Sequence, residues 1–317
     1  MIFTIYALAV LPNNLYTLDI VKSVILIYNR VSMTTTSENS IFDTPTHRAD
    51  SNVFYATMIS NVSPVIDLRG IEKRFGYGDT QTIALDGVDL VIERGEFVAI
   101  MGPSGCGKTT LLNIIGLLDQ PTGGEYKLNS KNVAKLPPGR KAKIRNREIG
   151  FVFQNFNLIH KLTVIDNVAL PLTYSRGLNY KHQEKASKIL TALGLHSREY
   201  YMPYQLSGGQ MQRVAIARAL ANEPSIILAD EPTGNLDSKN SEIIMDELTR
   251  IHREGNTILM VTHNPELLSY AGRVIHMKDG QIDRDIELVD NKAYATASKF
   301  KSRRKESRKR TWIRRRK

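Results

Sequence analysis

The sequence of 317 residues contains a single cysteine, Cys106, which excludes an internal disulfide framework and is typical of a reducing compartment. It also lacks a long uncharged apolar run. Met1–Pro12 is too short to cross a bilayer, and charged residues interrupt Leu18–Tyr28. No basic segment precedes the first run, so a secretory signal peptide is not predicted. With 42% apolar and 24% charged residues, the composition indicates a globular chain that can bury a sizeable core.

Acidic residues are scarce only near the C-terminal end of the sequence. Lys299–Lys317 contains twelve Lys or Arg residues and one Glu, which accounts for the whole formal net charge of +11. The remaining chain is neutral, so a basic nucleic-acid-binding surface is not indicated for its folded part. The basic segment cannot fold alone, because its like charges repel and it buries little. A solvated tail, a nucleic-acid-binding arm and a tether to anionic lipid are the alternatives.

The first 63 residues show no pattern of a folded domain. Residues 32–63 are rich in Ser, Thr and Asn without an apolar period, which is typical of a disordered linker. We predict a disordered or non-native N-terminal extension over 1–63, with Met33 and Met58 as plausible starts; a weak interfacial anchor is the alternative. One folded domain is predicted over 64–288, followed by a basic disordered tail over 289–317.

A glycine-rich stretch, Gly102–Thr109, matches the pattern G-x-x-x-x-G-K-[ST]. It lies between the apolar run Phe97–Met101 and the helical run Leu111–Ile115, which is the strand-loop-helix setting that a phosphate-binding loop requires. Backbone N–H groups at a helix N-terminus bind phosphate, Lys108 adds positive charge for the β- and γ-phosphates, and the Thr109 hydroxyl can ligate Mg²⁺. The stretch predicts a site for a nucleoside triphosphate.

Strands and helices alternate along most of the predicted domain. Strands are expected at Val65–Arg69, Ala84–Ile92, Phe97–Met101, Ile149–Phe153, Ile226–Ala229 and Thr257–Val261, with a closing hairpin over 274–282. Helices are expected from the glycine-rich stretch to about Leu118, at Lys141–Arg147 (basic and exposed), over almost all of 163–222, and at Ser238–Arg253. We therefore predict an α/β fold: a P-loop NTPase (RecA-like) core with a parallel sheet, an antiparallel β subdomain, and a helical subdomain inserted at about 158–222.

Two adjacent carboxylates, Asp230 and Glu231, follow the apolar strand Ile226–Ala229. Ligands of parallel α/β sheets bind at the C-terminal ends of the strands. Asp230 is predicted to hold Mg²⁺ through the coordination shell of the ion, and Glu231 is predicted to polarise an attacking water. An ordinary strand followed by an acidic turn is the alternative interpretation, and the phosphate-binding loop makes it the weaker one.

A second anion site is predicted at Leu206–Gln210, where Ser207, Gly208 and Gly209 stand at a helix N-terminus. Unpaired N–H groups and a hydroxyl favour an anion there, although the same residues could form only an N-cap. Two phosphate sites on different subdomains indicate that two chains, arranged head to tail, enclose two nucleotides. Each nucleotide would lie between the glycine-rich loop of one chain and the Ser-Gly-Gly of the other.

With these motifs in this order, the sequence resembles the nucleotide-binding subunit of an ATP-binding cassette (ABC) transporter, in particular the branch of lipoprotein-release, macrolide-efflux and cell-division ATPases. The resemblance covers about residues 65–285. It identifies Gly102–Thr109 as the Walker A motif, Leu206–Gln210 as the signature, Ile226–Glu231 as Walker B, Gln154 as the Q-loop glutamine, Gly234–Asp237 as the D-loop and His263 as the switch histidine.

The resemblance also implies the roles of single residues. Catalysis is assigned to Glu231, His263, Gln154 and Lys108, and the metal to Thr109, Gln154 and Asp230. ATP binding is assigned to Phe75, Gly102, Pro103, Ser104, Gly105, Cys106, Gly107, Lys108, Thr109 and Thr110, and the trans contact to Ser207, Gly208, Gly209 and Gln210, with Asp237 in the D-loop. Phe75 replaces the usual adenine-stacking tyrosine, keeping the ring and losing the hydroxyl; Tyr77 is the alternative. Cys106 is either a small residue without a chemical role or a thiol that the N–H groups of the loop and Lys108 make reactive by stabilising its thiolate form.

These implications give an expected function. The chain would be an ATPase using ATP with Mg²⁺, forming a homodimer or pairing with another cassette, and driving a separate multi-pass permease from the cytoplasmic face of the cell membrane. Asn155–Ile159 would belong to the groove where the permease docks. A soluble ABC-type ATPase acting on nucleic acid or the ribosome is the alternative, and a small-molecule kinase would not explain Ser207–Gln210. Beside a membrane, the basic tail is expected to contact anionic lipid, and nucleic acid is disfavoured.

Overall fold

The structure is a computed structural model that describes residues 63–76, 81–176 and 180–288. The predicted N-terminal extension (apart from residue 63), Tyr77 and the basic tail lie outside the described residues. Within the described ranges, none of the helices combines the length and the apolar character needed to cross a bilayer.

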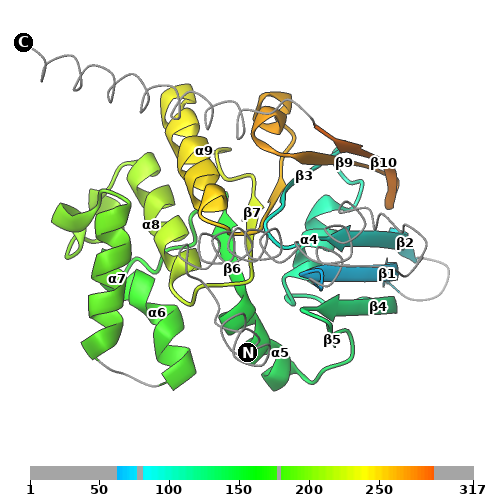
Figure 1. The fold of residues 1–317 in the computed structure, drawn as a ribbon, viewed down its shortest axis with the longest axis horizontal. Helices are drawn as coiled ribbons and strands as arrows, with labels where there is room; N and C mark the ends of the chain where they lie inside the picture. Colours follow the sequence, from blue (N-terminus) through cyan, green and yellow to red (C-terminus); the bar gives the residue numbers. More distant parts are fainter. Residues whose placement is uncertain (1–62, 77–80, 177–179, 289–317) are drawn as a thin grey trace, which may run out of the picture. The chain divides into compact units, whose positions relative to one another are not determined.

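A six-stranded sheet forms the centre of the described domain (Figure 1). Its order is β10-β9-β3-β8-β7-β6; neighbouring strands are parallel except β10, which is antiparallel to β9. The strands are β3 (Phe97–Met101), β6 (Ile149–Phe153), β7 (Ile226–Asp230), β8 (Ile258–Val261), β9 (Arg273–Lys278) and β10 (Gln281–Glu287). Because β3, β6, β7 and β8 end at one edge, the glycine-rich loop, Gln154, Glu231 and His263 all follow at that edge.

A four-stranded antiparallel sheet lies against one face of this centre. Its order is β2-β1-β4-β5, with β1 (Ile66–Phe75), β2 (Thr82–Ile92), β4 (Gly123–Leu128) and β5 (Lys131–Asn132). Helix α4 (Lys108–Ile115) shares one apolar core with both sheets. Fully buried Tyr126 donates its hydroxyl to Ile115 O at 2.6 Å, and this burial raises its pKa. The glycine-rich loop is thereby anchored to both sheets.

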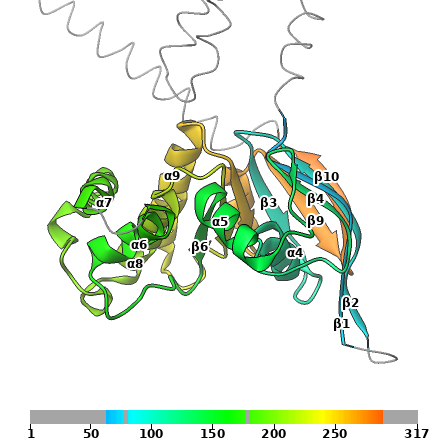
Figure 2. The same ribbon diagram turned by 90° about the horizontal axis from the view of Figure 1, so that it is seen from below.

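Helices cover the other face of the central sheet. Alternate residues of β3 divide between the two cores: Val98 and Ile100 face α4, whereas Phe97 and Ala99 join the core of the helical side. The helices on this face are α6 (Val164–Arg176), α7 (Tyr180–Ala192), α8 (Gly208–Leu220) and α9 (Ser238–Arg253). Helix α5 (Pro138–Glu148) instead packs Ile144 against the core that contains α4. Figure 2 shows α6, α7 and α8 on the side away from the antiparallel sheet. A Cβ on Gly150 would lie 2.5 Å from Ala219 O, so α8 packs with its backbone against β6.

Several local predictions are wrong in detail. Lys141 of α5 is not exposed: only 7% of it is accessible, its ammonium donates to Ala134 O at 3.0 Å, and burial lowers its pKa. The helix after the glycine-rich loop ends at Ile115, three residues early. The stretch 193–207 contains only two 3₁₀ turns, His196–Arg198 and Pro203–Gln205, because Gly194 takes a left-handed conformation and Pro203 cannot continue an α-helix.

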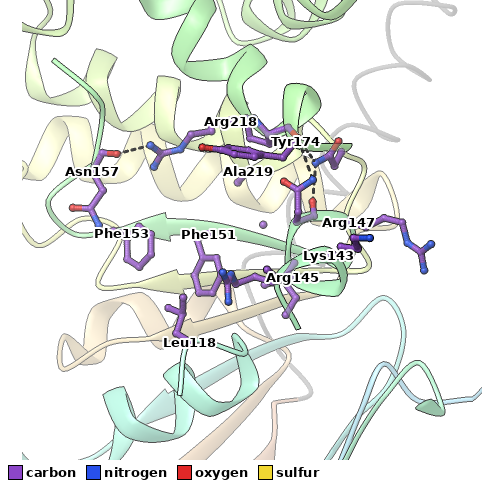
Figure 3. Close-up of a pocket in the computed structure, with 16 residues that line it drawn as sticks. Leu118, Lys143, Arg145, Arg147, Phe151, Phe153, Asn157, Tyr174, Arg218 and Ala219 are labelled. Carbon is purple, nitrogen blue, oxygen red and sulfur yellow. Dashed lines mark hydrogen bonds between the residues drawn. The ribbon is translucent and has the colours of Figure 1, made fainter. Parts of the chain in front are cut away.

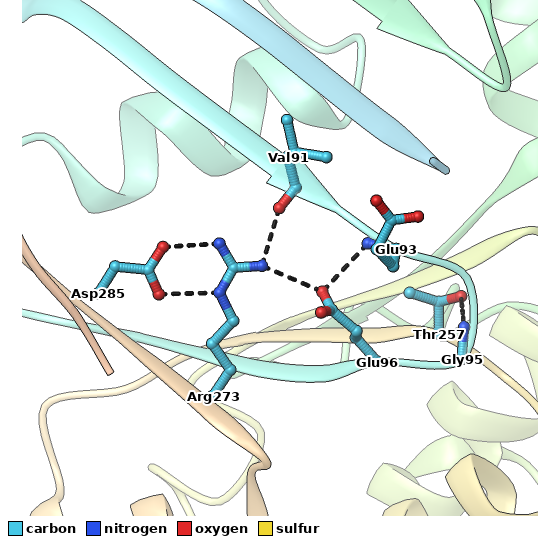
Figure 4. Close-up of polar contacts among 7 residues, drawn as sticks. All are labelled: Val91, Glu93, Gly95, Glu96, Thr257, Arg273 and Asp285. Carbon is cyan, nitrogen blue, oxygen red and sulfur yellow. Dashed lines mark hydrogen bonds and ion pairs between the residues drawn. The ribbon is translucent and has the colours of Figure 1, made fainter. Parts of the chain in front are cut away.

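Arg273 joins the two sheets (Figure 4). Its Nε and Nη2 atoms donate to the two carboxylate oxygens of Asp285 at 2.8 and 2.6 Å. Nη1 donates to Val91 O of β2 at 2.9 Å and to Glu96 at 3.2 Å. The hydrogen bond from Arg273 lowers the pKa of Asp285, whereas burial raises that of Glu96. A bidentate, charge-assisted arrangement of this kind fixes orientation as well as distance.

Candidate phosphate-binding and catalytic site

The glycine-rich loop runs from the end of β3 into the first turn of α4. Gly105 and Gly107 adopt left-handed φ angles of 82° and 99°, which turn the backbone at little steric cost. Lys108 curls back over the loop, and its Nζ donates to Gly102 O and Pro103 O at 2.8 Å each. A cation and a helix N-terminus therefore face the same small space, which suits a polyphosphate.

Packing also requires glycine at both ends of this loop. A Cβ on Gly102 would lie 2.2 Å from Met277 O of β9, and a Cβ on Gly107 would lie 2.5 Å from Ala84 O of β2. Cys106 is only 4% exposed and packs in the core beneath the loop. Its Sγ lies 3.8 Å from the Lys108 ammonium. The reactivity predicted for Cys106 stays a prediction.

Phe75 ends β1 with 45% of its surface exposed. The Lys73 ammonium lies 4.9 Å from the centre of its ring, close enough for a cation–π contact. Lys73 also binds Asp119 at 2.7 Å and Gln120 O at 2.8 Å, in the segment after α4. The sequence analysis missed Lys73, although its position two residues before Phe75 on a strand puts both side chains on one face. Lys73 thus connects the aromatic ring to the segment that follows α4.

Asp230 is the last residue of β7, and Glu231 follows it. Burial, and then the neighbouring charge of Glu231, raise the pKa of Asp230, while the positive charge of Lys108 acts against the rise. Glu231 has a left-handed φ of 44°, and its Oε1 lies 2.6 Å from His263 Nδ1. The structure therefore brings together Lys108, Asp230, Glu231 and His263, which come from three separate parts of the sequence.

Gln154 follows β6 and contacts the predicted D-loop. Asn235 Nδ2 donates to Gln154 O at 3.0 Å and to Asn155 Oδ1 at 2.7 Å, while Gln154 Nε2 approaches Asn235 Oδ1 at 3.4 Å. Asp237 caps α9 by accepting a hydrogen bond from Asn240 N at 2.8 Å, and this bond lowers the Asp237 pKa. In this structure Asp237 thus serves as a helix cap.

Ser207 begins α8 in a capping box. Its Oγ accepts from Gln210 N at 3.4 Å, and Ser207 N donates to Gln210 Oε1 at 2.9 Å. A Cβ on Gly209 would lie 2.5 Å from Asn240 Oδ1, and one on Gly208 would lie 3.2 Å from Leu236. The described contacts of Ser207–Gln210 are with each other, the rest of α8, Phe156, the predicted D-loop and α9, and do not include the glycine-rich loop.

The residues predicted to hold a metal, Thr109, Gln154 and Asp230, offer a hydroxyl, an amide and a carboxylate. These oxygen donors fit Mg²⁺, which keeps several waters and uses few protein ligands together with substrate phosphates. No group of three or more His, Cys, Asp or Glu side chains that could hold a metal occurs in the described part of the chain. The donor set therefore suits a metal that arrives with a phosphate ligand.

A groove of about 810 Å³ opens between α5, β6, α6 and α8 (Figure 3). Leu118 and Tyr174 lie on it with exposed apolar surface. Among the lining residues that the structure describes, the charged ones are all basic, namely Lys143, Arg145, Arg147 and Arg218. Of the predicted segment Asn155–Ile159, only Asn157 is among the described lining residues. The groove therefore combines apolar surface with positive charge.

Arg218 connects this groove to the segment after Gln154. Its guanidinium donates to Asn157 O and, at 2.8 Å, to Phe156 O. Phe156 and Asn157 both adopt left-handed conformations, with φ of 61° and 48°, which cost energy in residues other than glycine. Burial lowers the pKa of Arg218. Arg218 thus stabilises a strained turn just beyond the end of β6.

Comparison with known proteins places these features in a family. Residues 85–234 match the family described as ABC transporter. An uncharacterized ABC transporter ATP-binding protein of Methanocaldococcus jannaschii is 49% identical over 226 residues, covering 71% of this chain and 100% of that protein. The uncharacterized ABC transporter ATP-binding protein YknY of Bacillus subtilis is 48% identical, covering 69% of this chain and 95% of that protein.

A longer relative and a solved structure extend the comparison. The macrolide export ATP-binding/permease protein MacB of Chlorobium phaeobacteroides is 50% identical over 75% of this chain, which spans 37% of that protein's length. A dimeric, post-hydrolysis structure of the ATP-binding cassette MJ0796 with ADP and Pi matches with 46% identity and a TM-score of 0.65, covering 70% of this chain and 98% of that chain. The predicted fold class and the resemblance are confirmed.

Proposed function

Since the chain belongs to the ABC transporter family, we propose that it is a subunit that binds and hydrolyses ATP to drive a membrane permease. One observation carries the hydrolytic part of this proposal. The Lys108 ammonium, held over the glycine-rich loop, lies close enough to Asp230 to affect its pKa, and the Glu231–His263 pair stands at the same edge of the sheet.

The proposed chemistry assigns one task to each side chain. The N–H groups of the loop and Lys108 stabilise charge on the β- and γ-phosphates. Glu231 accepts a proton from the attacking water, and His263 holds the Glu231 carboxylate in place. Thr109, Asp230 and Gln154 would hold Mg²⁺, which supplies charge neutralisation on the phosphate oxygens. Phe75 offers an aromatic face to adenine.

Hydrolysis is proposed to require a pair of cassettes. Ser207–Gln210 makes no described contact with the glycine-rich loop of its own chain, so an anion at the N-terminus of α8 would belong to a nucleotide bound elsewhere. The related cassette MJ0796 was solved as a dimer in a post-hydrolysis state. We propose that this chain also dimerises on ATP, with Ser207 completing the site of the partner, which is a second copy or another cassette.

The basic groove is the proposed docking site for the permease, placed at the cytoplasmic face of the cell membrane. Its apolar and basic lining suits an apolar segment that carries acidic residues. Arg218 would relay occupancy of the groove, because the same guanidinium lines the groove and holds Phe156 O next to the Gln154 segment.

Photocrosslinking from the groove tests this function. Because the only native cysteine is buried, Tyr174→Cys introduces a single exposed thiol, which can carry a maleimide-benzophenone. On illumination in host membranes, we expect an adduct whose second polypeptide has several membrane spans. The control is Ile83→Cys, which replaces another exposed apolar residue, on β2 and outside the groove. Equal adduct formation at both positions would contradict the docking proposal.

The proposed contact between the basic tail and anionic lipid concerns residues outside those described. It is supported by composition: each Lys or Arg near an anionic surface contributes up to about 1 kcal/mol, and a Trp among them can settle in the interface. We expect the full chain to float with anionic vesicles and a chain lacking 298–317 to float less. The difference should shrink at high salt, because charges are screened over ~8 Å at physiological ionic strength.

Neutral vesicles are the control for this flotation measurement. Equal flotation of both chains on anionic vesicles would reject the tether. Tight, saturable binding of DNA by the tail would instead favour the alternative of an ATPase acting on nucleic acid.

A further inference from the structure

Gln212 is a fully buried residue of α8, five positions after Ser207. Its Nε2 donates to Pro232 O at 2.7 Å and approaches Phe153 O at 3.4 Å. Pro232 immediately follows Glu231, and Phe153 immediately precedes Gln154. One amide group on α8 therefore contacts the backbone beside two predicted catalytic residues.

The first of these carbonyl groups lies where the sheet stops providing partners, whereas Phe153 O also accepts a hydrogen bond from Phe156 N at 3.2 Å. The register between β6 and β7 ends at the pair Phe153 and Asp230, so Pro232 O lies beyond the ladder. A buried carbonyl without a donor destabilises the structure, and Gln212 provides that donor. The bond also restrains the turn in which Glu231 takes its left-handed conformation and Gly234 N donates back to Glu231 O at 3.0 Å.

The other end of the Gln212 amide finds no hydrogen-bond partner among the described residues. Its Oε1 is buried and, within the described part of the chain, forms no hydrogen bond, which costs stability relative to an apolar side chain of similar volume. Reversing the amide would place this oxygen against two carbonyl oxygens, so the orientation is defined. A methionine would fill a similar volume without burying an unpaired oxygen. What glutamine adds at this position is therefore the pair of donated hydrogen bonds.

From this geometry we infer that Gln212 is a positioning residue for hydrolysis: it holds the Glu231–Gly234 turn and the start of the Gln154 segment in one arrangement relative to the signature helix α8. The inference rests on the proposed function. It assigns two roles to the first turns of α8. Ser207, at the N-terminus of the helix, would contact the nucleotide of the partner chain, and Gln212 would restrain the backbone next to Glu231 in its own chain.

Gln212→Met keeps the length of the side chain and removes the donor. We expect kcat for ATP to fall at least tenfold while KM changes less than twofold, because neither Phe75 nor the glycine-rich loop contacts Gln212. Added to Glu231→Gln, the substitution should lower turnover little further.

Gln212→Glu gives a second readout. A neutral carboxyl group at this position can donate a hydrogen bond to Pro232 O, whereas a charged one cannot. The kcat of this variant should therefore decline with rising pH at a step that is absent from the wild-type profile.

Hydrogen exchange decides the inference independently of activity. In the full chain, Gln212→Met should accelerate exchange of the 231–236 segment, where the Gly234 amide is bonded to Glu231 O. Thr249→Val is the matched control, since it removes another buried donor, the Thr249 hydroxyl bonded to Met245 O at 2.8 Å, and should lower stability without changing kcat or this exchange. Unchanged exchange at 231–236 in Gln212→Met would overturn the inference. A wild-type chain that fails to hydrolyse ATP would instead reject the proposed function, and the exchange result would still stand.

Discussion

Replacing Glu231 by glutamine should lower ATP turnover by about 10²–10⁴-fold, the usual loss when a general base is removed, while ATP still binds. The amide has the shape of the carboxylate, so the contact with His263, at 2.6 Å from Oε1, can persist with the ring nitrogen as donor. The glycine-rich loop and Lys108 are untouched. ATP should therefore be held without being cleaved, and the chain should accumulate as an ATP-bound dimer.

Phosphate release at saturating ATP with Mg²⁺, together with size-exclusion chromatography, measures both effects. Glu184→Gln is a suitable control, because Glu184 is an exposed carboxylate of α7 outside the predicted machinery. Turnover close to that of wild type in Glu231→Gln would remove Glu231 from the role of base. Loss of ATP binding would mean that Glu231 contributes chiefly to binding ATP in the ground state and not to the hydrolysis step.

Mixing two inactive variants should restore part of the ATPase activity. Lys108→Ala removes the cation that faces the phosphates, and Ser207→Arg places a bulky cation at the N-terminus of α8. Each variant alone forms dimers in which both sites are defective. In a mixed dimer, one site pairs an intact Lys108 with an intact Ser207 and the other site carries both defects. At equal amounts, up to about a quarter of the wild-type sites are regenerated if chains pair at random.

Phosphate release after the two variants are mixed provides the measurement. The matched control mixes Lys108→Ala with a chain that carries both substitutions, because no combination of those chains forms an intact site. If the first mixture is no more active than the average of its components, the head-to-tail arrangement is wrong for this chain.

Local sequence patterns were sufficient where neighbours along the chain decide the structure. The helix Ser238–Arg253 and the strand Ile149–Phe153 begin and end where predicted. The helix has a cap at Asp237 and an apolar stripe, and the strand is a short apolar run. The glycine-rich loop is recognisable because phosphate binding requires consecutive residues.

Contacts between distant parts of the chain could not be predicted in this way. The partners of Gln212 lie 20 and 59 residues away, so nothing around position 212 marks it as more than a polar residue in a helix. Lys141 sits in a basic stretch that is typical of a solvated surface, yet its ammonium binds a carbonyl in the loop preceding α5. The groove requires four elements that meet only after folding. The resemblance supplied the roles of Gln154 and His263, which single residues cannot reveal.

The Arg273 junction has a consequence for nucleotide binding. Phe75, which would take the base, stands on the antiparallel sheet, and the glycine-rich loop, which would take the phosphates, leaves the central sheet. The distance between the position for the base and the position for the phosphates therefore depends on how the two sheets are oriented relative to each other. Arg273 helps to fix this orientation, because its guanidinium donates hydrogen bonds to Val91 O on β2 and to Asp285 on β10. Substitution of Arg273 is therefore expected to change the affinity for a nucleotide while both binding loops stay identical in sequence.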